Sequence, residues 1–353
     1  MANAFQTVDW MKMSCLDNLV NQLGIFHNFN HDVEEDFEKA FAVGSSVRVK
    51  KPQQWTIRDG LGYVPQGINR LTTTVNMDQV FGIDFEWDSY ERAVNMERSE
   101  AALEKEYIQP AMAQLAQEID SRAALWATLN TNNIVGVLGT DGTTFDVISG
   151  AARQRLVENG CPAAGERIMC VPPNIMRALK ASQLTFFQPP TEIAKSYRSG
   201  IVGNADSFEW YESMSLYSHT AGSLTATPTL TTTLTSGATS CTITCTNGDT
   251  LIQGNVITFS ACNQVNPRTR RKTTTVLKPF VNTTAGTTTA AASAITISIS
   301  PACYGPGSQY QNVDALPLSG ATVVLMPGTS SPNGKSGVNA LAFHENAFAG
   351  VTL

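Results

Sequence analysis

A long amphipathic segment between residues 95 and 129 constrains the fold more than any other part of the sequence. Its apolar residues recur at intervals of four, three, four and four, which is the spacing of one helix face; they are Ile108, Met112, Leu115, Ile119 and Ala123. The opposite face carries acidic and amide side chains, among them Glu104, Gln114 and Glu118. At 1.5 Å per residue this helix would be about 50 Å long. We therefore expect an elongated protein built along a helical spine.

Further helices are predicted at the N-terminus, within residues 1–43. One helix follows the 3.6-residue period and ends at Gly24; its apolar positions are Trp10, Met13, Leu16, Leu19, Val20 and Leu23. A second, short helix is predicted from His31 to Ala42. In the spine, Pro110 lacks a backbone donor, so it either kinks the helix or lies in the first turn of a second segment.

Residues 44–92 change to the period of two that is typical of strands. Val47 and Val49 alternate with Arg48 and Lys50, and a second alternating run covers residues 80–87. The segment between them is rich in Gly and Pro, so the pattern predicts a long two-stranded arm. Because an isolated hairpin is marginal in water, this arm needs another surface, in its own chain or in a neighbour's.

The following part of the chain, residues 133–217, has the pattern of a mixed α/β region. We predict strands at Ile134–Leu138 and Arg167–Val171, a helix over Ser149–Glu158, and another helix from Pro172 to Lys180. Residues 338–353 end the chain as an apolar, strand-like tail, which we place beside this region.

Charge is distributed unevenly, and its absence marks a further region. Charged residues make up 15% of the 353 residues, against about 25% in typical soluble domains. Between Glu212 and Asp314 there are only six. Residues 218–330 are rich in Thr, Ser and Ala, a composition also found in disordered mucin-like stretches. Alternating apolar residues such as Ile295, Ile297 and Ile299 favour a packed all-β barrel or sandwich instead.

Composition also excludes several protein classes. No run of about 18 apolar residues is present, which argues against a membrane span, and Met1–Trp10 lacks the pattern of a secretory signal. A net charge of −6 without a basic block disfavours tight nucleic-acid binding. Seven cysteines without a signal peptide indicate reduced intracellular thiols; they are Cys15, Cys161, Cys170, Cys241, Cys245, Cys262 and Cys303.

Motifs for chemistry are weak throughout. Gly328–Ser336 resembles a phosphate-binding loop but has five residues between its glycines where the motif needs four. His27 and His31 would share a helix face and could hold a metal, although Asn28 and Asn30 favour a turn.

The remaining candidates favour structural interpretations. Cys241 and Cys245 are expected to line a core, and the basic run Arg268–Lys272 is better explained as a salt-bridging loop than as a phosphate site. We expect no catalytic residue, no cofactor and no metal site.

The order of these elements, together with particular stretches, resembles the major capsid protein of tailed bacteriophages. The similar stretches are Tyr107–Asp120, Thr191–Met214, Asn263–Thr269 and Asn339–Phe348. The resemblance is to the short-tailed-phage coat-protein branch of the Hong-Kong-97-type fold, which carries an inserted β domain. It covers nearly the whole chain, and residues 218–290 match least well.

This resemblance implies an α+β fold with a specific plan. Its parts would be an N-terminal helical arm, an extended β arm or E-loop, a spine helix with the peripheral domain, an axial α/β domain, an inserted barrel-like β domain, and a C-terminal strand returning to the core. Their respective ranges would be 1–43, 44–92, 93–150, 151–217, 218–330 and 331–353.

The resemblance also implies a function. The chain would self-assemble into hexamers and pentamers of an icosahedral head that encloses double-stranded DNA without sequence-specific binding. A scaffolding protein and a portal protein would be partners, and a decoration protein is a possible one. The subunit would assemble in the host bacterial cytoplasm and reside in the virion, with no membrane partner. A tail-fibre or surface-adhesin protein with a Thr-rich β domain is the alternative.

Charges on the arm supply the candidate contacts between subunits. Arg48, Lys50 and Lys51 could meet the acidic start of another subunit's spine; its residues would be Glu97, Glu100 and Glu104. Simple solvation of these charges is an equal alternative for any one pair.

Overall fold

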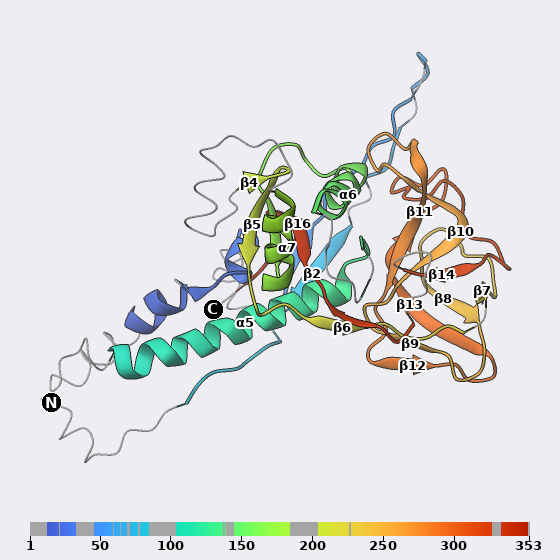
Figure 1. The fold of residues 1–353 in the computed structure, drawn as a ribbon. Coiled ribbons are helices and arrows are strands. Elements are labelled where there is room, and N and C mark those ends of the chain that lie inside the picture. The colour runs from blue at the N-terminus through green and yellow to red at the C-terminus, as the bar shows by residue number, and fades with distance from the viewer. Residues whose placement is uncertain are drawn as a thin grey trace, which may run out of the picture. The chain divides into compact units, whose positions relative to one another are not determined.

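The computed structural model describes most of the chain in two compact units. The described residues are 13–20, 22–32, 46–58, 60–63, 65–68, 71–76, 78–84, 104–136, 138, 145–183, 204–225, 227–326 and 333–351. The first unit consists of Met1–Val47, Thr74–Ala124 and Asn346–Leu353. The second consists of Arg48–Thr73 and Leu125–Glu345. Figure 1 shows the elements of both.

The first unit is built on the spine helix. A π-helical turn, η2 (Glu104–Ile108), leads into the helix α5 (Gln109–Asn130). Pro110 is the second residue of α5 and directly follows the π-helical turn, where the i→i−4 hydrogen-bond pattern of the α-helix begins. The most buried positions recur every four residues and differ in part from the predicted set; they are Ile108, Met112, Ala116, Asp120 and Ala124. The expected helix is confirmed from Gln109 onward, and residues 95–103 lie outside the described part of the chain.

Asp120 is the polar member of this buried row, and it organises the N-terminal segment. Its carboxylate accepts hydrogen bonds from the backbone N–H groups of Gly24, Ile25 and Phe26, at 2.9, 3.1 and 2.9 Å. These groups open the 3₁₀-helix η1 (Phe26–Asn28), so Asp120 caps it from a distant element. Residues 13–20 are helical, as expected. The proposed helix from His31 to Ala42 lies outside the described residues after Asp32, and His31 itself is not helical.

The C-terminal segment completes the first unit. Asn30 donates its backbone N–H to the Phe348 carbonyl at 2.9 Å, and Gly350 donates to the Asn30 carbonyl at 3.0 Å. The Phe29 and Phe348 rings lie 5.1 Å apart. Gly350 is needed there, because a Cβ would lie 2.6 Å from the Phe26 ring. The two ends of the described chain are therefore packed against each other.

An α/β layer forms one part of the second unit. Four strands lie in the order β16, β3, β5, β4, with β3 antiparallel to β16 and parallel to β5. Their bounds are Leu341–His344 (β16), Arg167–Val171 (β3), Phe208–Glu212 (β5) and Asn204–Ala205 (β4). β3 occurs where it was predicted, and its residues Ile168–Val171 are all apolar because the strand is buried on both faces after Arg167. The strand-like tail does lie beside this layer, as β16.

Two helices accompany this sheet. α6 (Phe145–Glu158) ends in a Schellman motif: Gly160, with a φ of +82°, donates to the Val157 carbonyl, and Cys161 donates to Leu156. α7 (Pro173–Gln183) begins at Pro173, a favoured first helical residue. The two helices agree with the prediction apart from their ends. α7 packs Met176 and Leu179 onto side chains of the sheet; those side chains are Met169, Val171, Phe208 and Trp210.

The Thr-rich region folds into a closed β-barrel, which also belongs to the second unit. Its six strands lie in the order β14, β10, β11, β13, β8, β7. Their bounds are Thr229–Leu230 (β7), Ala238–Thr244 (β8), Val256–Val265 (β10), Lys272–Asn282 (β11), Ala294–Cys303 (β13) and Val323–Leu325 (β14). The two outer strands meet through an antiparallel bridge between Thr229 and Thr322, and Leu230 donates to the Ala321 carbonyl. The sheet therefore has no open edge at this point, and the barrel interpretation is confirmed over the disordered one.

Alternate residues of the barrel strands form its core. Ile295, Ile297 and Ile299 point inward, as their alternation predicted, while Thr296 and Ser298 between them are exposed. The Phe259 and Phe280 rings pack 5.6 Å apart, both fully buried. A short pair, β9 (Thr250–Ile252) with β12 (Thr287–Thr289), adds to the barrel wall.

The chain enters and leaves the barrel region through a two-stranded neck, formed by β6 (Ser218–Thr220) and β15 (Ser336–Val338). These strands pair antiparallel, with Gly337 opposite His219. The Thr220 and Ser336 hydroxyls share a hydrogen bond of 2.7 Å. The neck is thus the double connection between the barrel and the α/β layer.

Two predicted strands were wrong. The arm's second strand is β2 (Thr72–Asn76), which pairs with β1 (Ser46–Lys50), whereas residues 81–84 form no strand and 85–87 lie outside the described part. Phe81 instead lies under the Arg122 guanidinium of α5, 4.4 Å from its ring centroid. Residues 134–136 and 138 are irregular, although Ile134–Leu138 was predicted as a strand. Asn132 just before them donates to the Pro279 carbonyl at 3.1 Å, so this segment is bound to the barrel instead.

Candidate assembly surface

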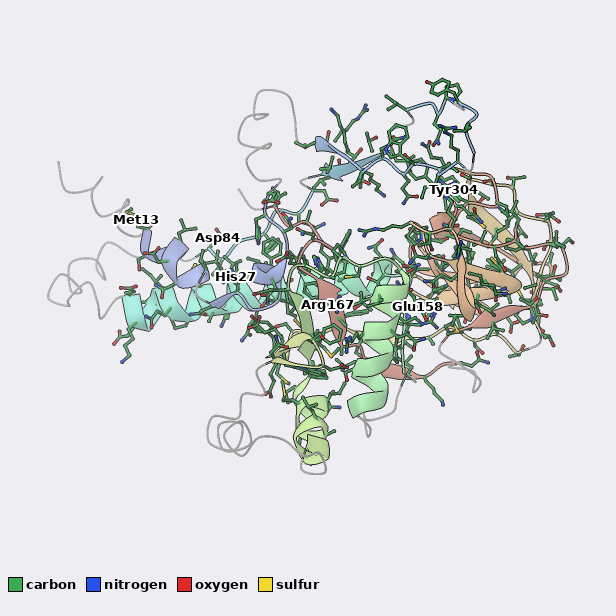
Figure 2. The ribbon with its side chains drawn as sticks, turned by 90° about the horizontal axis from the view of Figure 1, so that it is seen from above. Met13, His27, Asp84, Glu158, Arg167 and Tyr304 are labelled. Atoms are coloured by element: carbon green, nitrogen blue, oxygen red, sulfur yellow. The ribbon has the colours of Figure 1, made fainter. Side chains whose placement is uncertain are left out.

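The arm exposes large apolar side chains at its end. Ile57 is 89% exposed, Tyr63 is 85% exposed and Leu61 is entirely exposed. Trp55 and Ile68 are also exposed. Single exposed apolar residues are ordinary on protein surfaces, but a cluster on one projecting segment marks an interaction surface. Figure 2 shows the arm's side chains standing clear of the barrel over most of its length. We call residues 55–68 the arm tip.

The arm tip is ordered by its own hydrogen bonds. Thr56 donates its N–H to the Gln66 side-chain oxygen at 2.8 Å, and the Gln66 amide donates back to the Thr56 carbonyl. The Arg58 guanidinium donates to the carbonyls of Gly60 and Gly62. At the base of the arm, the Gln309 amide donates to the Gln54 carbonyl at 2.7 Å. These bonds hold parts of the arm backbone within the second unit, while the large apolar side chains are exposed.

Three of the predicted contact residues lie on the exposed side of the arm. Arg48 and Lys50 are exposed while Val47 and Val49 between them are half-buried, so both cations lie on the same face of β1. Lys51 follows directly and is exposed too. Arg48 and Lys50 thus share one exposed face of β1, and Lys51 is exposed just beyond the strand; their contact with another subunit stays a prediction.

The acidic half of the predicted contact is only partly described. Glu97 and Glu100 lie outside the described residues. Glu104 accepts hydrogen bonds through Oε1 from the Ser14 hydroxyl at 2.7 Å and the Asn18 amide at 2.8 Å. These bonds lower the pKa of the Glu104 carboxyl. Its contact with another subunit therefore stays a prediction, and its contact within the first unit is the new observation.

The N-terminal helix presents a second apolar surface. Met13, Leu16 and Val20 are 71%, 61% and 49% exposed. Figure 2 labels Met13 at the start of the described part of this helix. The helix period was predicted correctly. Its inward side in the described part is formed by polar residues, because Ser14 and Asn18 bond Glu104.

The structure assigns structural roles to the weaker sequence motifs. His27 lies in the 3₁₀-helix and His31 beyond it, so the turn interpretation holds for this pair. Part of the phosphate-loop candidate lies outside the described residues, and its end, from Ser336, is strand β15 instead of the required helix. Lys272 forms an ion pair with Asp314 at 3.5 Å, which agrees with a salt-bridging loop. Among the described residues, no three His, Cys, Asp or Glu side chains gather as metal ligands do.

The barrel interior contains buried thiols and one buried amine. Cys241 and Cys245 are core residues, as predicted, and all seven cysteines are free. Burial raises the pKa of Cys241 to about 12. Lys278 is 6% exposed, and its burial lowers its pKa to about 8. Sequence patterns did not single out Lys278, although a Lys two residues before an inward-facing Phe280 on one strand was a readable signal.

Asp120 was also missed as a structural residue. The signal was present, because it occupies the four-residue spacing of Met112, Ala116 and Ala124 on the spine. An acidic residue in a buried helix row needs donors, and the sequence does not indicate that these come from residues 24–26.

Comparisons with known proteins gave matches among solved structures only. No protein-family model matches the chain, and no curated protein sequence matches it. A structure described as Mycobacterium phage Che8 aligns with 86% of this chain and 90% of its own, at 16% identity and a TM-score of 0.44. The mature capsid of bacteriophage PhiM1 aligns over 85% and 82%, at 11% identity and a TM-score of 0.36. The capsid of cyanophage P-SCSP1u aligns over 82% and 84%, at 11% identity and 0.34.

At these TM-scores the alignments do not themselves establish a shared fold. They do show that solved structures similar to this chain include phage capsids. No helix within the described ranges is both long enough and apolar enough to cross a membrane.

Proposed function

We propose that this chain is a structural subunit of the icosahedral head of a tailed bacteriophage. The observation that carries the proposal is the arm tip, where five large apolar side chains on one segment are exposed. A segment of this kind is stabilised when another copy covers it. The proposed subunit acts by assembling with copies of itself and has no catalytic role in this proposal.

Burial of the arm tip would supply much of the driving force. Covering one large apolar side chain contributes roughly 1.5–3 kcal/mol, and the tip presents five of them. Arm-over-neighbour contacts are head-to-tail, so they close into rings when the rotation allows. Hexamers and pentamers are the rings that tile an icosahedral shell.

The parts of the Hong-Kong-97-type plan have natural counterparts here. The spine would be α5, and the axial domain would be the sheet around β3, completed by β16. The barrel, attached by the two-stranded neck, would be the inserted domain. The same proposal includes a peripheral domain and an N-terminal arm. It divides the chain at the predicted boundaries, which are 1–43, 44–92, 93–150, 151–217, 218–330 and 331–353.

The net charge of the chain supports a shell that encloses DNA without binding it tightly. The chain carries a net charge of −6, so it offers few phosphate contacts. Scaffolding and portal proteins are the partners that such an assembly needs, and the barrel offers a surface for a decoration protein. The virion, assembled in the host cytoplasm, is the proposed location.

Electron microscopy of assembly products tests the proposal directly. The chain would be expressed with its neighbouring genes as wild type, as the double variant Ile57→Ser/Leu61→Ser, and as Leu318→Ser. Leu318 is a matched control, because it is 65% exposed on a barrel loop. We expect closed shells for wild type and Leu318→Ser, and only unassembled protein for the arm variant. Small particles alone for wild type under every condition, or shells for the arm variant, would contradict the proposal.

A further inference from the structure

A buried histidine lies in the neck of the barrel. His219 is the middle residue of β6, and its side chain is 5% exposed. Its Nε2 lies 3.1 Å from the Asn255 side-chain nitrogen, at the start of β10. The ring therefore joins the neck to the barrel wall.

The direction of this hydrogen bond is fixed by the other contacts of Asn255. Its side-chain oxygen accepts the backbone N–H of Ile252 at 2.7 Å and of Gly222 at 3.1 Å. Turning the amide over would place its NH₂ group against these two donors. The Asn255 nitrogen must therefore donate, and His219 Nε2 must accept. Only a neutral imidazole with its proton on Nδ1 can do so.

The backbone beside this pair is closely packed at two glycines. A Cβ on Gly254 would lie 2.8 Å from the Leu129 side chain of α5 and 3.3 Å from the His219 ring. A Cβ on Gly222 would lie 2.3 Å from the Thr250 carbonyl. The end of the spine helix, the neck and the β9–β10 turn thus converge on the His219 ring.

Among the described residues, no charged side chain forms a hydrogen bond or an ion pair with the ring. Asn255 is bonded to its Nε2, Gly337 lies opposite His219 in the neck, and Gly254 lies beside the ring. The nearest charged residues along these elements are Lys335, which would repel an imidazolium, and Asp249. The Asp249 carboxylate already accepts bonds from Thr225 and Thr246. Burial accordingly lowers the pKa of His219.

We propose that the His219–Asn255 pair is a pH-sensitive latch, which holds the neck and the barrel together while His219 is neutral and releases them when it is protonated. Protonation converts Nε2 into a donor that faces the Asn255 donor, so the hydrogen bond is lost and a charge is buried. Loss of this bond frees β6, together with its partner strand β15, from the barrel wall at Asn255. The latch belongs to the subunit itself and does not depend on shell formation.

His344 is a matched control within the same chain. It is buried to the same degree, 6% exposed, but its Nε2 lies 2.9 Å from the Ala164 carbonyl. A carbonyl requires a donor, and a protonated imidazole still donates from Nε2. Protonation therefore breaks the contact of His219 and preserves this contact of His344.

Hydrogen–deuterium exchange of the full chain tests the latch. Wild type, His219→Gln and His344→Gln would be compared at about pH 7.5 and about pH 5.5, with rates normalised to the intrinsic exchange of an unfolded peptide. In wild type and His344→Gln, protection of the peptides spanning residues 217–222 and 334–339 should fall about tenfold at the lower pH, which is the most that a single histidine with a free pKa near 6.5 can contribute over this range. In His219→Gln it should change less than about twofold.

Two results would overturn the proposal: an equal loss of neck protection in His219→Gln, or no loss in wild type. If His219→Gln does not fold, the wild-type ring can be observed directly by NMR. A His219 pKa at or above about 6.5, or a proton on Nε2 at neutral pH, would then rule out the latch.

Discussion

The barrel and the arm are both β structures, yet they bury their apolar residues to opposite extents. The barrel closes its sheet on itself through Thr229 and Thr322, so alternate side chains of six strands meet in one interior. The arm has two described strands, β1 and β2, which form a sheet of their own, and the large apolar side chains of its tip are exposed. The same local alternation thus gives a self-sufficient domain in one place and an incomplete surface in the other.

This difference in burial indicates which part of the chain needs a partner. A closed barrel offers neither unpaired strand edges nor an exposed core, so its outer face of Thr and Ser residues can meet water. The arm tip, by contrast, leaves its large apolar side chains exposed. Low charge marks the barrel region and not the arm. The number of strands that share a core decides which of the two regions buries its apolar side chains.

Truncating the barrel core gives the largest expected effect and tests one side of this comparison. Phe259→Ala removes a ring that is fully buried against Phe280. It should lower the free energy of unfolding by about 3–5 kcal/mol, measured by urea denaturation of the unassembled subunit. Trp55→Ala in the arm is the matched aromatic control and should change it by less than about 0.5 kcal/mol. A loss of similar size for Trp55→Ala would mean that the arm is packed within its own chain.

The pH dependence of stability can be compared at a buried lysine of the barrel, Lys278, and an exposed lysine of the arm, Lys50. The pKa of Lys278 is lowered to about 8, so between about pH 8 and its unfolded value near 10.5 the unfolded chain holds one more proton than the folded one. The contribution of Lys278 to stability therefore rises with pH in that window. Below it, burial of the amine costs about 3 kcal/mol as an order of magnitude.

Lys278→Met should consequently stabilise the subunit most at about pH 7 and progressively less toward about pH 10.5. Lys50→Met, at an exposed position of the arm, should show no such trend. Unfolding free energies of both variants and wild type across this range provide the measurement. A gain for Lys278→Met that stays constant with pH would contradict the lowered pKa.

Much of the fold was predictable where one element carries its own pattern. β3, the barrel strands, the two helices beside the sheet and the spine beyond Pro110 follow from period, caps and turn residues. The latch pair was not predictable, because His219 and Asn255 lie 36 positions apart and no sequence pattern links them. Asp120 is similar, since its donors lie about 95 positions away.

The errors come from segments whose pattern was overridden by distant contacts. Residues 80–87 alternate like a strand, but Phe81 meets Arg122 and the guanidinium also donates to Gln79 at 2.9 Å. The β-branched run that begins at Thr72 pairs with β1 instead. On the spine, Asp120 shifted the buried row away from Leu115 and Ile119, because a carboxylate with three N–H donors is stable in the interior.

The arm's charges give the smallest expected effect and the finest test of the comparison. Exposed ion pairs contribute about 0–1 kcal/mol each, so a change appears only when it is repeated over every subunit of a shell. Arg48→Glu/Lys50→Glu should lower shell yield while leaving the unfolding of the free subunit unchanged. Adding Glu97→Lys/Glu100→Lys in the same chain should restore yield, because the reversed charges attract again.

Arg268→Glu/Arg271→Glu is the matched control for this test, since it changes the net charge equally at two exposed positions of the barrel. Its shell yield should equal that of wild type. Yields are best measured by sedimentation at low and at moderate salt, because screening weakens exposed pairs. An unchanged yield for the arm reversal, or an equal loss for the barrel reversal, would show that these arm charges do not contribute specifically to the assembly contact. The apolar arm tip would then be left as the part of the arm that makes it.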